Sequence, residues 1–394
     1  MSVPASPSAR ASSPAPAPRT VGHVITGLEV GGAEGMLLKL LGARDRERFR
    51  MIVYSLTGDG PIGEAIARLG VPVRRLGMSR GVPNPLALLR LARLLRADGV
   101  QLVQTWMYHA DLLGGLAARL AGVPVVWGIR HSTLDATTYK ARTVLVQRVC
   151  ARLSRWVPAR IVCNSEAGAR VHAAVGYDGG RMICIPNGFE LARFAPSAEH
   201  RASVRAELGL PAGAGLVGLL ARYNPQKDHA TFLRAAAVVA RARPEVHFLL
   251  AGTGVDPGNP ALAGLAEGLG ILDRVHLLGR REDVPRLVAA LDVAGLSSAS
   301  GEGFPNVVGE AMACAVPCVV TDCGDSAAIV GDTGEVVPVS DPDAFGAAVL
   351  RVLALPPAER QRRGAAARAR IGREFELAGV ARRFEQVYAE VLGG

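Results

Sequence analysis

The amino-acid sequence predicts an α/β protein with two domains, each built on a parallel β-sheet that helices cover. The length of 394 residues exceeds one ordinary domain and suits two of about 150 to 200 residues each. Short apolar runs alternate with stretches of helical periodicity along the chain, which is typical of parallel sheets. That alternation pauses once, near residue 195, where we place the boundary between the domains.

The first domain is expected over residues 20–195. Short apolar runs between amphipathic stretches are typical of buried strands, and here they occur at 21–26, 51–56, 101–105, 123–129 and 160–163. Residues 1–19 are rich in Ser, Ala and Pro and show neither a packing pattern nor the apolar region of a secretory signal. We interpret them as a disordered tail.

The second domain is expected over residues 196–375, with strands at 216–220, 247–251, 275–278, 293–297 and 318–321. Neither domain carries a complete G-x-G-x-x-G motif after its first strand, which argues against a nicotinamide-dependent enzyme. Residues 376–394 are expected to form a separate C-terminal unit, in which 377–392 has the pattern of an amphipathic helix.

The net charge of +10 is compatible with three kinds of partner: nucleic acid, anionic lipid or a phosphate-bearing substrate. Aromatic residues make up only 5% of the chain and do not interleave with basic residues, so nucleic acid is the weakest of the three. No apolar run reaches the roughly 18 residues of a membrane-spanning helix. These features indicate a cytoplasmic protein.

The six cysteines are expected to be reduced structural thiols, because they lie in apolar or small-residue contexts and no secretory signal is found. Cys314, Cys318 and Cys323 are close together in the sequence, but no nearby histidine completes a tetrahedral set. We therefore expect no metal site and no cofactor.

The most informative stretch is 298–310, Ser-Ala-Ser-Gly-Glu-Gly-Phe-Pro-Asn-Val-Val-Gly-Glu. Pro305 suits the first position of a helix, so the amides that follow should be unpaired and attract phosphate. Those amides belong to Asn306, Val307 and Val308. Glu302 lies in the preceding loop and Glu310 about one and a half turns into the helix, where each carboxylate could hold hydroxyl groups. This pattern favours a nucleotide-sugar site.

An independent pair of cations supports this interpretation. Arg222 and Lys227 follow the apolar run 216–220 and precede a stretch of helical periodicity. Both therefore lie on a loop at the carboxyl end of a strand, where open α/β sheets bind ligands. Two cations at that position suit a diphosphate.

The first domain offers fewer candidates. Gly31 and Gly32 follow the first strand and open a helix, so a ligand or the facing domain could approach the backbone closely. His109 and His131 lie near the ends of two strands and should face the cleft between the domains; His131 is the stronger candidate. Asp111 lies nearby, without an assigned role.

The segment 139–160 contains six basic residues and no acidic residue. An apolar stripe at helical spacing runs through it, formed by Leu145, Val149, Leu153 and Trp156. Such a helix could lie on an anionic membrane surface, or it could be an ordinary surface helix packed on the first sheet.

Taken together, these motifs resemble the GT-B superfamily of retaining, nucleotide-sugar-dependent glycosyltransferases (family 4-like, group 1), from about residue 21 to the carboxyl terminus. The resemblance rests on motifs that occur in the same order as in this family. They are 31–34, Asn164-Ser165, 185–188 with Arg193-Phe194, Arg222 with Lys227, 252–254, and Glu302 with Glu310. It implies two Rossmann-like domains with parallel sheets that face each other across a cleft, and a C-terminal helix that returns to the first domain.

The resemblance also implies roles for individual residues. Arg222 and Lys227 would bind the donor diphosphate, with help from the amides of Val307 and Val308 in place of a metal. Glu310 would bind the ribose, Glu302 the sugar hydroxyls, and His131 would lie beside the transferred sugar. The remaining donor-site positions would be Arg280, next to the nucleobase, and Gly303, Phe304, Pro305 and Asn306 at the helix start; Gly31 and Gly32 would face them from the first domain.

We accordingly expect a metal-independent, retaining transferase that moves a sugar from a UDP- or GDP-sugar to a glycan or lipid-linked acceptor. Its products would belong to cell-surface polysaccharide or glycolipid biosynthesis, and the enzyme would work in the cytoplasm, either free or peripherally bound to the inner face of the membrane. Two alternatives stay open: a sugar-nucleotide epimerase of the same fold, and a protein that binds nucleotide sugars without turnover.

Overall fold

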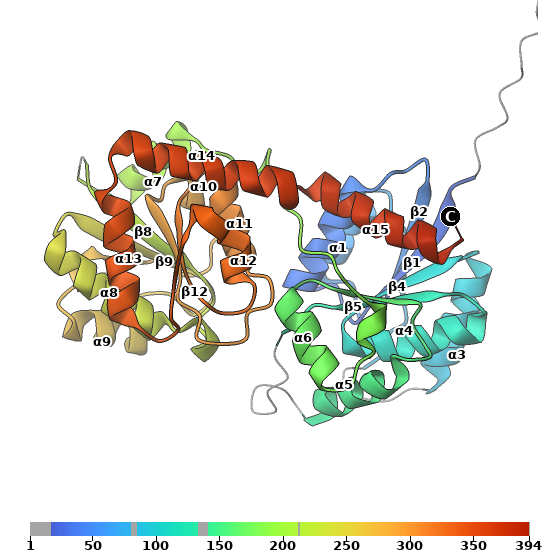
Figure 1. Ribbon diagram of the computed structural model, residues 1–394. Helices are drawn as coiled ribbons and strands as arrows, with labels where there is room; N and C mark the ends of the chain where they lie inside the picture. The colour runs from blue at the N-terminus through green and yellow to red at the C-terminus, as the bar shows by residue number, and fades with distance from the viewer. Residues whose placement is uncertain (1–16, 80–84, 133–140, 212, 394) are drawn as a thin grey trace, which may run out of the picture.

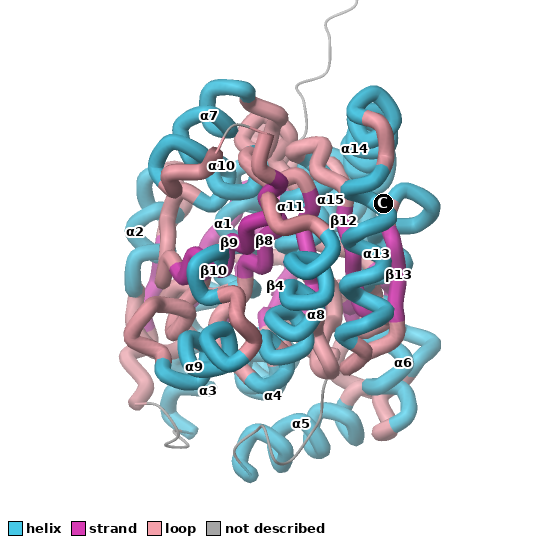
Figure 2. Tube along the Cα trace, turned by 90° about the vertical axis from the view of Figure 1, so that its left-hand side faces the viewer, coloured by secondary structure: helices cyan, strands magenta, loops and turns pink. Residues whose placement is uncertain are grey.

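The structure is a computed structural model that describes residues 17–79, 85–132, 141–211 and 213–393. Two α/β domains lie side by side, and the chain crosses between them twice (Figure 1). Each domain contains one parallel sheet with helices on both sides, as the strands and helices in Figure 2 show. The predicted α/β class with two parallel sheets is confirmed.

The sheet of the first domain has seven parallel strands in the order β3-β2-β1-β4-β5-β6-β7. These are β1 Arg19–Ile25, β2 Phe49–Ser55, β3 Val73–Arg75, β4 Leu102–Trp106, β5 Val125–Ile129, β6 Arg160–Cys163 and β7 Met182–Cys184. The helices are α1 Gly32–Ala43, α2 Gly60–Arg68, α3 Pro85–Ala97, α4 Tyr108–Ala121, α5 Ala141–Leu153 and α6 Glu166–Ala174. The edge strands β3 and β7 are too short, at three residues each, for a pattern to predict.

The sheet of the second domain has six parallel strands in the order β10-β9-β8-β11-β12-β13. They are β8 Gly215–Leu220, β9 Val246–Ala251, β10 Val275–Leu277, β11 Val293–Leu296, β12 Cys318–Thr321 and β13 Glu335–Val337. The helices are α7 Ala198–Glu207, α8 His229–Ala242, α9 Pro260–Gly268, α10 Val284–Ala289, α11 Asn306–Ala313, α12 Ser326–Val330, α13 Pro342–Ala354 and α14 Pro357–Glu374.

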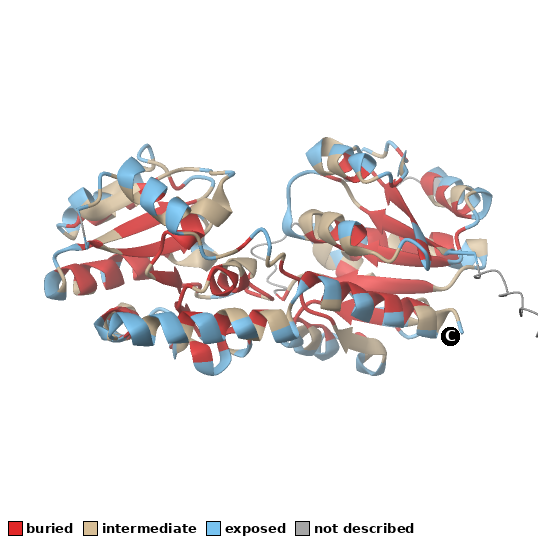
Figure 3. Ribbon diagram, turned by 90° about the horizontal axis from the view of Figure 1, so that it is seen from above, coloured by how far each residue is buried: buried red, intermediate tan, exposed pale blue. Residues whose placement is uncertain are grey.

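Buried side chains concentrate on the strands and on the helix faces that cover them (Figure 3). In the first domain the two faces of the sheet carry separate apolar clusters, one beneath α1 and the other beneath α3 and α4. The second domain has one cluster that includes side chains from both faces of its sheet. Both domains therefore have a core of their own, and their strand ends are held rigidly enough to position loops.

The last helix, α15 (Leu377–Val391), packs on the first domain although it follows α14 of the second (Figure 1). Its buried residues Val380, Phe384 and Tyr388 join the cluster beneath α1. An apolar stripe at helical spacing thus faces the first sheet, because burying it removes that surface from water. The chain end ties the two domains together.

The two crossings lie against each other. The amide of Phe189 donates to the carbonyl of Phe375 at 2.9 Å, and the amide of Leu377 donates to the carbonyl of Phe189 at 3.0 Å. Gly188 is required at this contact, because a Cβ there would lie 2.7 Å from Cα of Leu377. The hinge between the domains is therefore a short pair of hydrogen-bonded segments.

Candidate functional site

The predicted site residues of the second domain lie beyond the carboxyl ends of β8, β10 and β11, on the following loops and on α11, at the edge of the sheet that faces the first domain. Hydrogen bonds join these loops: the amide of Ala299 donates to the carbonyl of Gln226 at 2.9 Å, and the hydroxyl of Ser297 donates to the carbonyl of Lys227 at 3.0 Å. Ligands of open α/β sheets bind at such an edge.

Lys227 and Glu302 form an ion pair between the ammonium group and Oε1 of the carboxylate. The hydroxyl of Ser298 donates to the same Oε1 at 2.5 Å. Lys227 ends a short 3₁₀ turn, Pro225–Lys227, which the side chain of Asn224 caps by accepting from the amide of Gln226 at 2.9 Å. The cation and the carboxylate that the sequence predicted separately are thus brought into direct contact.

The loop that carries Glu302 packs closely against the backbone of Gly324. That glycine has a φ of 62°, and a side chain there would collide with the backbone carbonyl of Glu302. The amide of the next residue, Asp325, donates to the carbonyl of Gly303 at 2.9 Å. Glu302 is only 8% exposed as a result, which strengthens its electrostatic interactions.

The start of α11 differs from the prediction. Pro305 is the N-cap residue, with ψ of 104°, and the helix begins at Asn306. The carbonyl of Pro305 accepts from the amide of Val308 at 3.2 Å, so the prediction that the Val308 amide is unpaired is wrong. A 3₁₀-type bond at the first turn uses this donor, as is common at helix ends.

The side chain of Phe304 lies in the core rather than in the site. Its ring packs on Phe189 and Phe375, with centroids 6.0 and 5.5 Å apart, and it is 8% exposed. Val308 is buried as well. At these positions only the backbone is placed to contact a ligand, and the phenylalanine anchors the loop beside the hinge.

Glu310 lies in the second turn of α11, and its side chain is 17% exposed. Burial raises the pKa of this carboxyl, while the charge of Lys39 counteracts the rise. Lys39 belongs to α1 of the first domain, and its ammonium lies 4.0 Å from Oε1 of Glu310. No motif in the sequence pointed to Lys39.

His131 follows β5 in the first domain. Burial, and then the charges of His172 and Arg222, lower its pKa to about 4, so the imidazole is neutral at physiological pH. Part of the charge that acts on His131 therefore comes from Arg222 of the second domain. Arg222 itself is exposed. His109 is exposed in the first turn of α4.

Gly31 and Gly32 form the exposed start of α1, with Gly31 as the N-cap. The carboxylate of Glu34 folds back over Gly31 and leaves no room for a Cβ there, whereas nothing lies within 4 Å of the corresponding position at Gly32. Arg280 is exposed on the loop after β10. Its neighbour Gly279 accepts from the amide of Gly252 at 2.8 Å, which joins the loops after β9 and β10.

Arg130 links the domains in a way that the sequence did not reveal. Its guanidinium lies 4.5 Å from the ring centroid of Trp106, and its Nη1 donates to Oδ1 of Asn187 at 2.9 Å. The side-chain amide of Asn187 in turn donates to Oδ1 of Asn306 at 2.8 Å. Burial lowers the pKa of Arg130 to about 10, so the group stays charged at neutral pH.

Asp111 is fully buried beneath the cleft. Its Oδ1 accepts from the hydroxyl of Thr105 at 2.5 Å and from the amide of Gly128 at 3.2 Å. Burial raises the pKa of this carboxyl to about 8. The residue therefore ties α4 to β4 and β5, a structural role.

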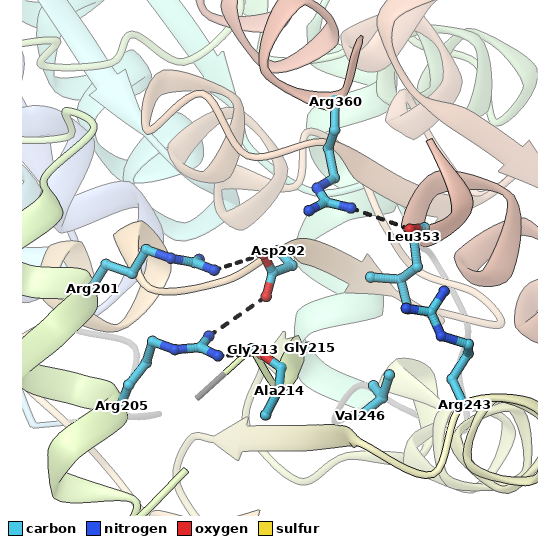
Figure 4. Close-up of a pocket in the computed structure, with 10 residues that line it drawn as sticks. All are labelled: Arg201, Arg205, Gly213, Ala214, Gly215, Arg243, Val246, Asp292, Leu353 and Arg360. Carbon is cyan, nitrogen blue, oxygen red and sulfur yellow. Dashed lines mark hydrogen bonds and ion pairs between the residues drawn. The ribbon is translucent and has the colours of Figure 1, made fainter. Parts of the chain in front are cut away.

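A pocket of about 400 Å³ lies at the other edge of the second sheet, at the amino ends of β8, β9 and β11. Arg201 and Arg205 point toward Asp292 there, at 2.8 and 3.6 Å, and Arg360 donates to the carbonyl of Leu353 at 3.2 Å (Figure 4). The pocket lies outside the candidate site, and its contacts join α7 to the sheet.

Helix α5 buries only part of the predicted apolar stripe. Its buried residues are Gln147, Cys150 and Ala151, and Leu153 packs against the cluster beneath α3 and α4. Leu145 is 62% exposed, and Trp156, which follows the helix, is 67% exposed. Tyr139 and Lys140, predicted to begin this helix, lie outside the described residues.

Three further findings concern the described part of the chain. None of its helices is long and apolar enough to cross a membrane. Within the same ranges, no group of three His, Cys, Asp or Glu side chains is placed to hold a metal ion. All six cysteines are free thiols, as predicted, and five of them are buried.

Comparison with known proteins identifies relatives. The family described as Glycosyltransferase Family 4 matches residues 30–193, and the family described as Glycosyl transferases group 1 matches residues 214–354. EpsF of Bacillus subtilis (strain 168) is 30% identical over 306 residues, which span 76% of this chain and 78% of EpsF. The UDP-Gal:alpha-D-GlcNAc-diphosphoundecaprenol alpha-1,3-galactosyltransferase of Escherichia coli is 28% identical over 271 residues, 68% of this chain and 70% of that enzyme.

A solved structure of Anabaena HepE in complex with UDP and glucose superposes with a TM-score of 0.79 at 21% identity, and the match covers 94% of this chain and all of that one. The fold is GT-B, as the sequence predicted.

Proposed function

The chain belongs to the group 1, family 4 glycosyltransferases, and on that premise we propose that it transfers a hexose from a nucleotide sugar to a hydroxyl group of a glycan or lipid-linked acceptor, with retention of configuration. The observation that carries the proposal is the Lys227–Glu302 pair, which stands beside the start of α11 at the edge that faces the first domain. A cation, a carboxylate and free helix amides at one point suit a diphosphate attached to a sugar.

On the donor side, Arg222 and Lys227 bind the diphosphate together with the amides of Asn306 and Val307 at the start of α11. Glu302 accepts hydrogen bonds from the hydroxyls of the sugar. Cations and helix amides stabilise the charge that develops on the leaving diphosphate, which is the main requirement of this chemistry. The remaining predicted donor contacts, Gly303 and the backbone of Phe304 and Pro305, line the same loop.

Glu310 accepts from the ribose hydroxyls, and Arg280 lies on the loop that faces the nucleobase. The ribose site is therefore built across the domains, because Lys39 of the first domain approaches the same carboxylate. Gly31 and Gly32 expose backbone at the start of α1 on that side. A donor bound here contacts both domains.

In the reaction, the bond between the anomeric carbon and the diphosphate oxygen breaks, and its electron pair leaves with the diphosphate. The acceptor oxygen forms the new bond on the same face of the sugar, and its proton passes to the leaving phosphate oxygen. Neither a protein nucleophile nor a metal is required, so catalysis consists of positioning and charge stabilisation. The neutral imidazole of His131 holds the transferred sugar.

The donor is a UDP- or GDP-sugar. The E. coli relative is named for UDP-Gal, and the HepE structure contains UDP and glucose, which favours UDP. The same relative acts on a diphosphoundecaprenol-linked sugar according to its name, which supports a lipid-linked acceptor in polysaccharide or glycolipid biosynthesis in the cytoplasm.

Thermal-shift titration against UDP-, GDP- and ADP-sugars tests the donor site, with the Glu310→Ala variant beside the wild type. Stabilisation by one nucleotide class that the variant loses supports the proposal. Product analysis separates the alternatives: an epimerase converts the donor without an acceptor and yields no glycoside, and a binding protein is stabilised by the donor but consumes none.

We propose in addition that α5 contacts an anionic membrane surface. Arg148, Arg152 and Arg155 line a groove of about 650 Å³ beside the exposed Trp156, and within the described residues no ion pair engages these three arginines. Exposed arginines around an exposed tryptophan are typical of interfacial helices.

Flotation with anionic and neutral liposomes tests this contact. We expect salt-sensitive flotation with anionic vesicles only, and its loss in a variant that combines Arg152→Gln, Arg155→Gln and Trp156→Ala. The matched control is Arg362→Gln on α14, an exposed arginine of the other domain. No flotation with either vesicle contradicts the proposal.

A further inference from the structure

Asp325 belongs to the second domain, but its side chain binds a helix of the first. Its Oδ2 accepts from the amide of Glu166 at 2.8 Å, and its Oδ1 accepts from the amide of Ala167 at 2.9 Å. These are the first two amides of α6, which have no partner within their own helix. Asp325 is 7% exposed, and no side-chain cap on its own helix α12 competes for it.

The cap of α6 is therefore shared between the domains. Ser165 of the first domain supplies the local part, because its hydroxyl accepts from the amide of Gly168 at 3.0 Å. Asp325 supplies the rest with one charged oxygen for each amide. A carboxylate at a helix N-terminus gains from hydrogen bonds to a charged acceptor and from the helix dipole, so this contact fixes both distance and orientation.

The turn that contains Gly324 and Asp325 also contacts the loop between β11 and α11, which we call the donor loop. The amide of Asp325 donates to the carbonyl of Gly303 at 2.9 Å, and Gly324 lies directly against the backbone of Glu302. Gly303 in turn faces the first domain, where a Cβ at that position would lie 3.3 Å from the hydroxyl of Ser165. A continuous path thus runs from α6 through Asp325 to Glu302 and its partner Lys227.

We propose that Asp325 is a positioning residue that couples closure of the two domains to the geometry of Glu302 and Lys227. The catalytic effect of Asp325 rests on the proposed function, whereas the contact between Asp325 and α6 is independent of that function. In an open form, water would hydrate the carboxylate and both amides, so the contact can form and break in each turnover.

Asp325→Asn tests the proposal in the full-length protein. The amide side chain keeps the shape but has one acceptor oxygen, and its NH₂ group would point at an amide N–H. The matched control is Asp322→Asn in the same turn, because Asp322 is exposed and its side chain makes no hydrogen bond or ion pair within the described residues. Asp325→Glu retains two oxygens and should restore part of the lost turnover.

We expect kcat of Asp325→Asn to fall about tenfold to a hundredfold, since small misplacements of reacting groups have such effects. UDP should still bind, because the residues proposed to contact its diphosphate belong to the second domain and are unchanged. The melting temperature should fall only slightly, since the N-terminus of α6 loses one charged acceptor. With UDP-sugar bound, small-angle X-ray scattering should give the variant a larger radius of gyration than the wild type. Unchanged kcat and radius, or a complete loss of UDP binding, would overturn the proposal.

The two hypotheses fail separately. If the wild type transfers no sugar from any nucleotide sugar, the proposed function is wrong, and the scattering comparison without ligand still decides whether Asp325 holds the domains together. If the wild type is active and Asp325→Asn matches both the wild type and the Asp322→Asn control in kcat and radius of gyration, only the proposed role of Asp325 is refuted.

Discussion

The ammonium of Lys39 in the first domain lies 4.0 Å from the carboxylate of Glu310 in the second. This pair joins α1 to the helix whose start faces the proposed diphosphate site. Burial raises the pKa of Glu310, and Lys39 is the first of the charges that counteract it. The ionisation of a carboxylate that we propose to bind the donor thus depends on a charge from the opposite domain.

Replacing Lys39 with methionine should move the acid limb of the activity profile. Without the neighbouring cation the pKa of Glu310 rises further, so the ionised carboxylate is lost at a higher pH. We expect the acid limb of kcat/KM, measured between about pH 5 and pH 8, to shift toward neutrality. Lys39→Arg keeps the charge and serves as control; an acid limb that coincides with wild type in Lys39→Met would contradict the assignment.

Breaking the Lys227–Glu302 pair should abolish most turnover while the fold survives. Lys227→Met removes a cation that we propose to act on the leaving diphosphate, and Glu302→Gln removes its counter-charge and a proposed acceptor for the sugar hydroxyls. We expect kcat to fall about 100- to 1000-fold in each. Transfer assays at saturating donor, with circular dichroism for the fold, make the measurement. Because the two residues act as a unit, the double variant should lose little more than either single variant; additive losses would show that they act independently.

The buried carboxyl of Asp111 should make the protein less stable as pH rises toward 8. Its pKa in the folded state is about 8, above its ordinary value, so the folded protein binds more protons than the unfolded chain between those values. Stability from this group is greatest at low pH and is lost as pH rises through that window. Buried neutral histidines such as His23 have the opposite effect, but only below about pH 6.5.

Urea unfolding at several pH values between about 6.5 and 8 isolates the contribution of Asp111. Asp111→Asn keeps an acceptor for Thr105 and Gly128 and cannot ionise, so its free energy of unfolding should vary less with pH than that of the wild type. Equal slopes for the two proteins would show that Asp111 does not titrate in this range.

Asp292→Ala should destabilise the second domain without changing the chemistry. Asp292 accepts from Arg201 at 2.8 Å and from the amide of Leu216 at 2.9 Å, at the edge of the sheet opposite the candidate site. We expect a loss of about 2 kcal/mol, because the partly buried Arg201 and Arg205 lose their counter-charge while water partly screens Arg201. Thermal unfolding measures the loss, and a changed donor KM below the melting transition would contradict the separation of the two edges.

Local patterns were enough to predict both sheets and most of the donor loop. The apolar runs that become β8 and β11 are continuous, and Arg222 and Lys227 follow the first of them. Carboxyl ends of parallel strands share one edge, so the location of the loops follows from the strand assignment. Pro305 was predicted at the first helical position but is the N-cap of α11 in the structure. The exact start of a helix depends on single hydrogen bonds, which local patterns do not predict.

Contacts between the domains could not be predicted in the same way. Lys39, Arg130 and Asp325 belong to no predicted motif, and Asn187 lies in the motif 185–188 without a predicted role. Each acquires its role only from a partner more than 50 residues away in the chain. Periodicity and turn chemistry report on neighbours along the sequence, whereas such pairs depend on how two rigid domains meet.

By itself, the sequence therefore determined the two α/β domains, the family resemblance and the cations and carboxylates of the donor loop, because these are local in the chain. Only the tertiary structure decided that Lys39 approaches Glu310, that Asp325 caps α6 and that the ring of Phe304 is buried rather than open to a ligand. Those contacts arise when packing brings distant segments together, and packing is a property of the whole fold.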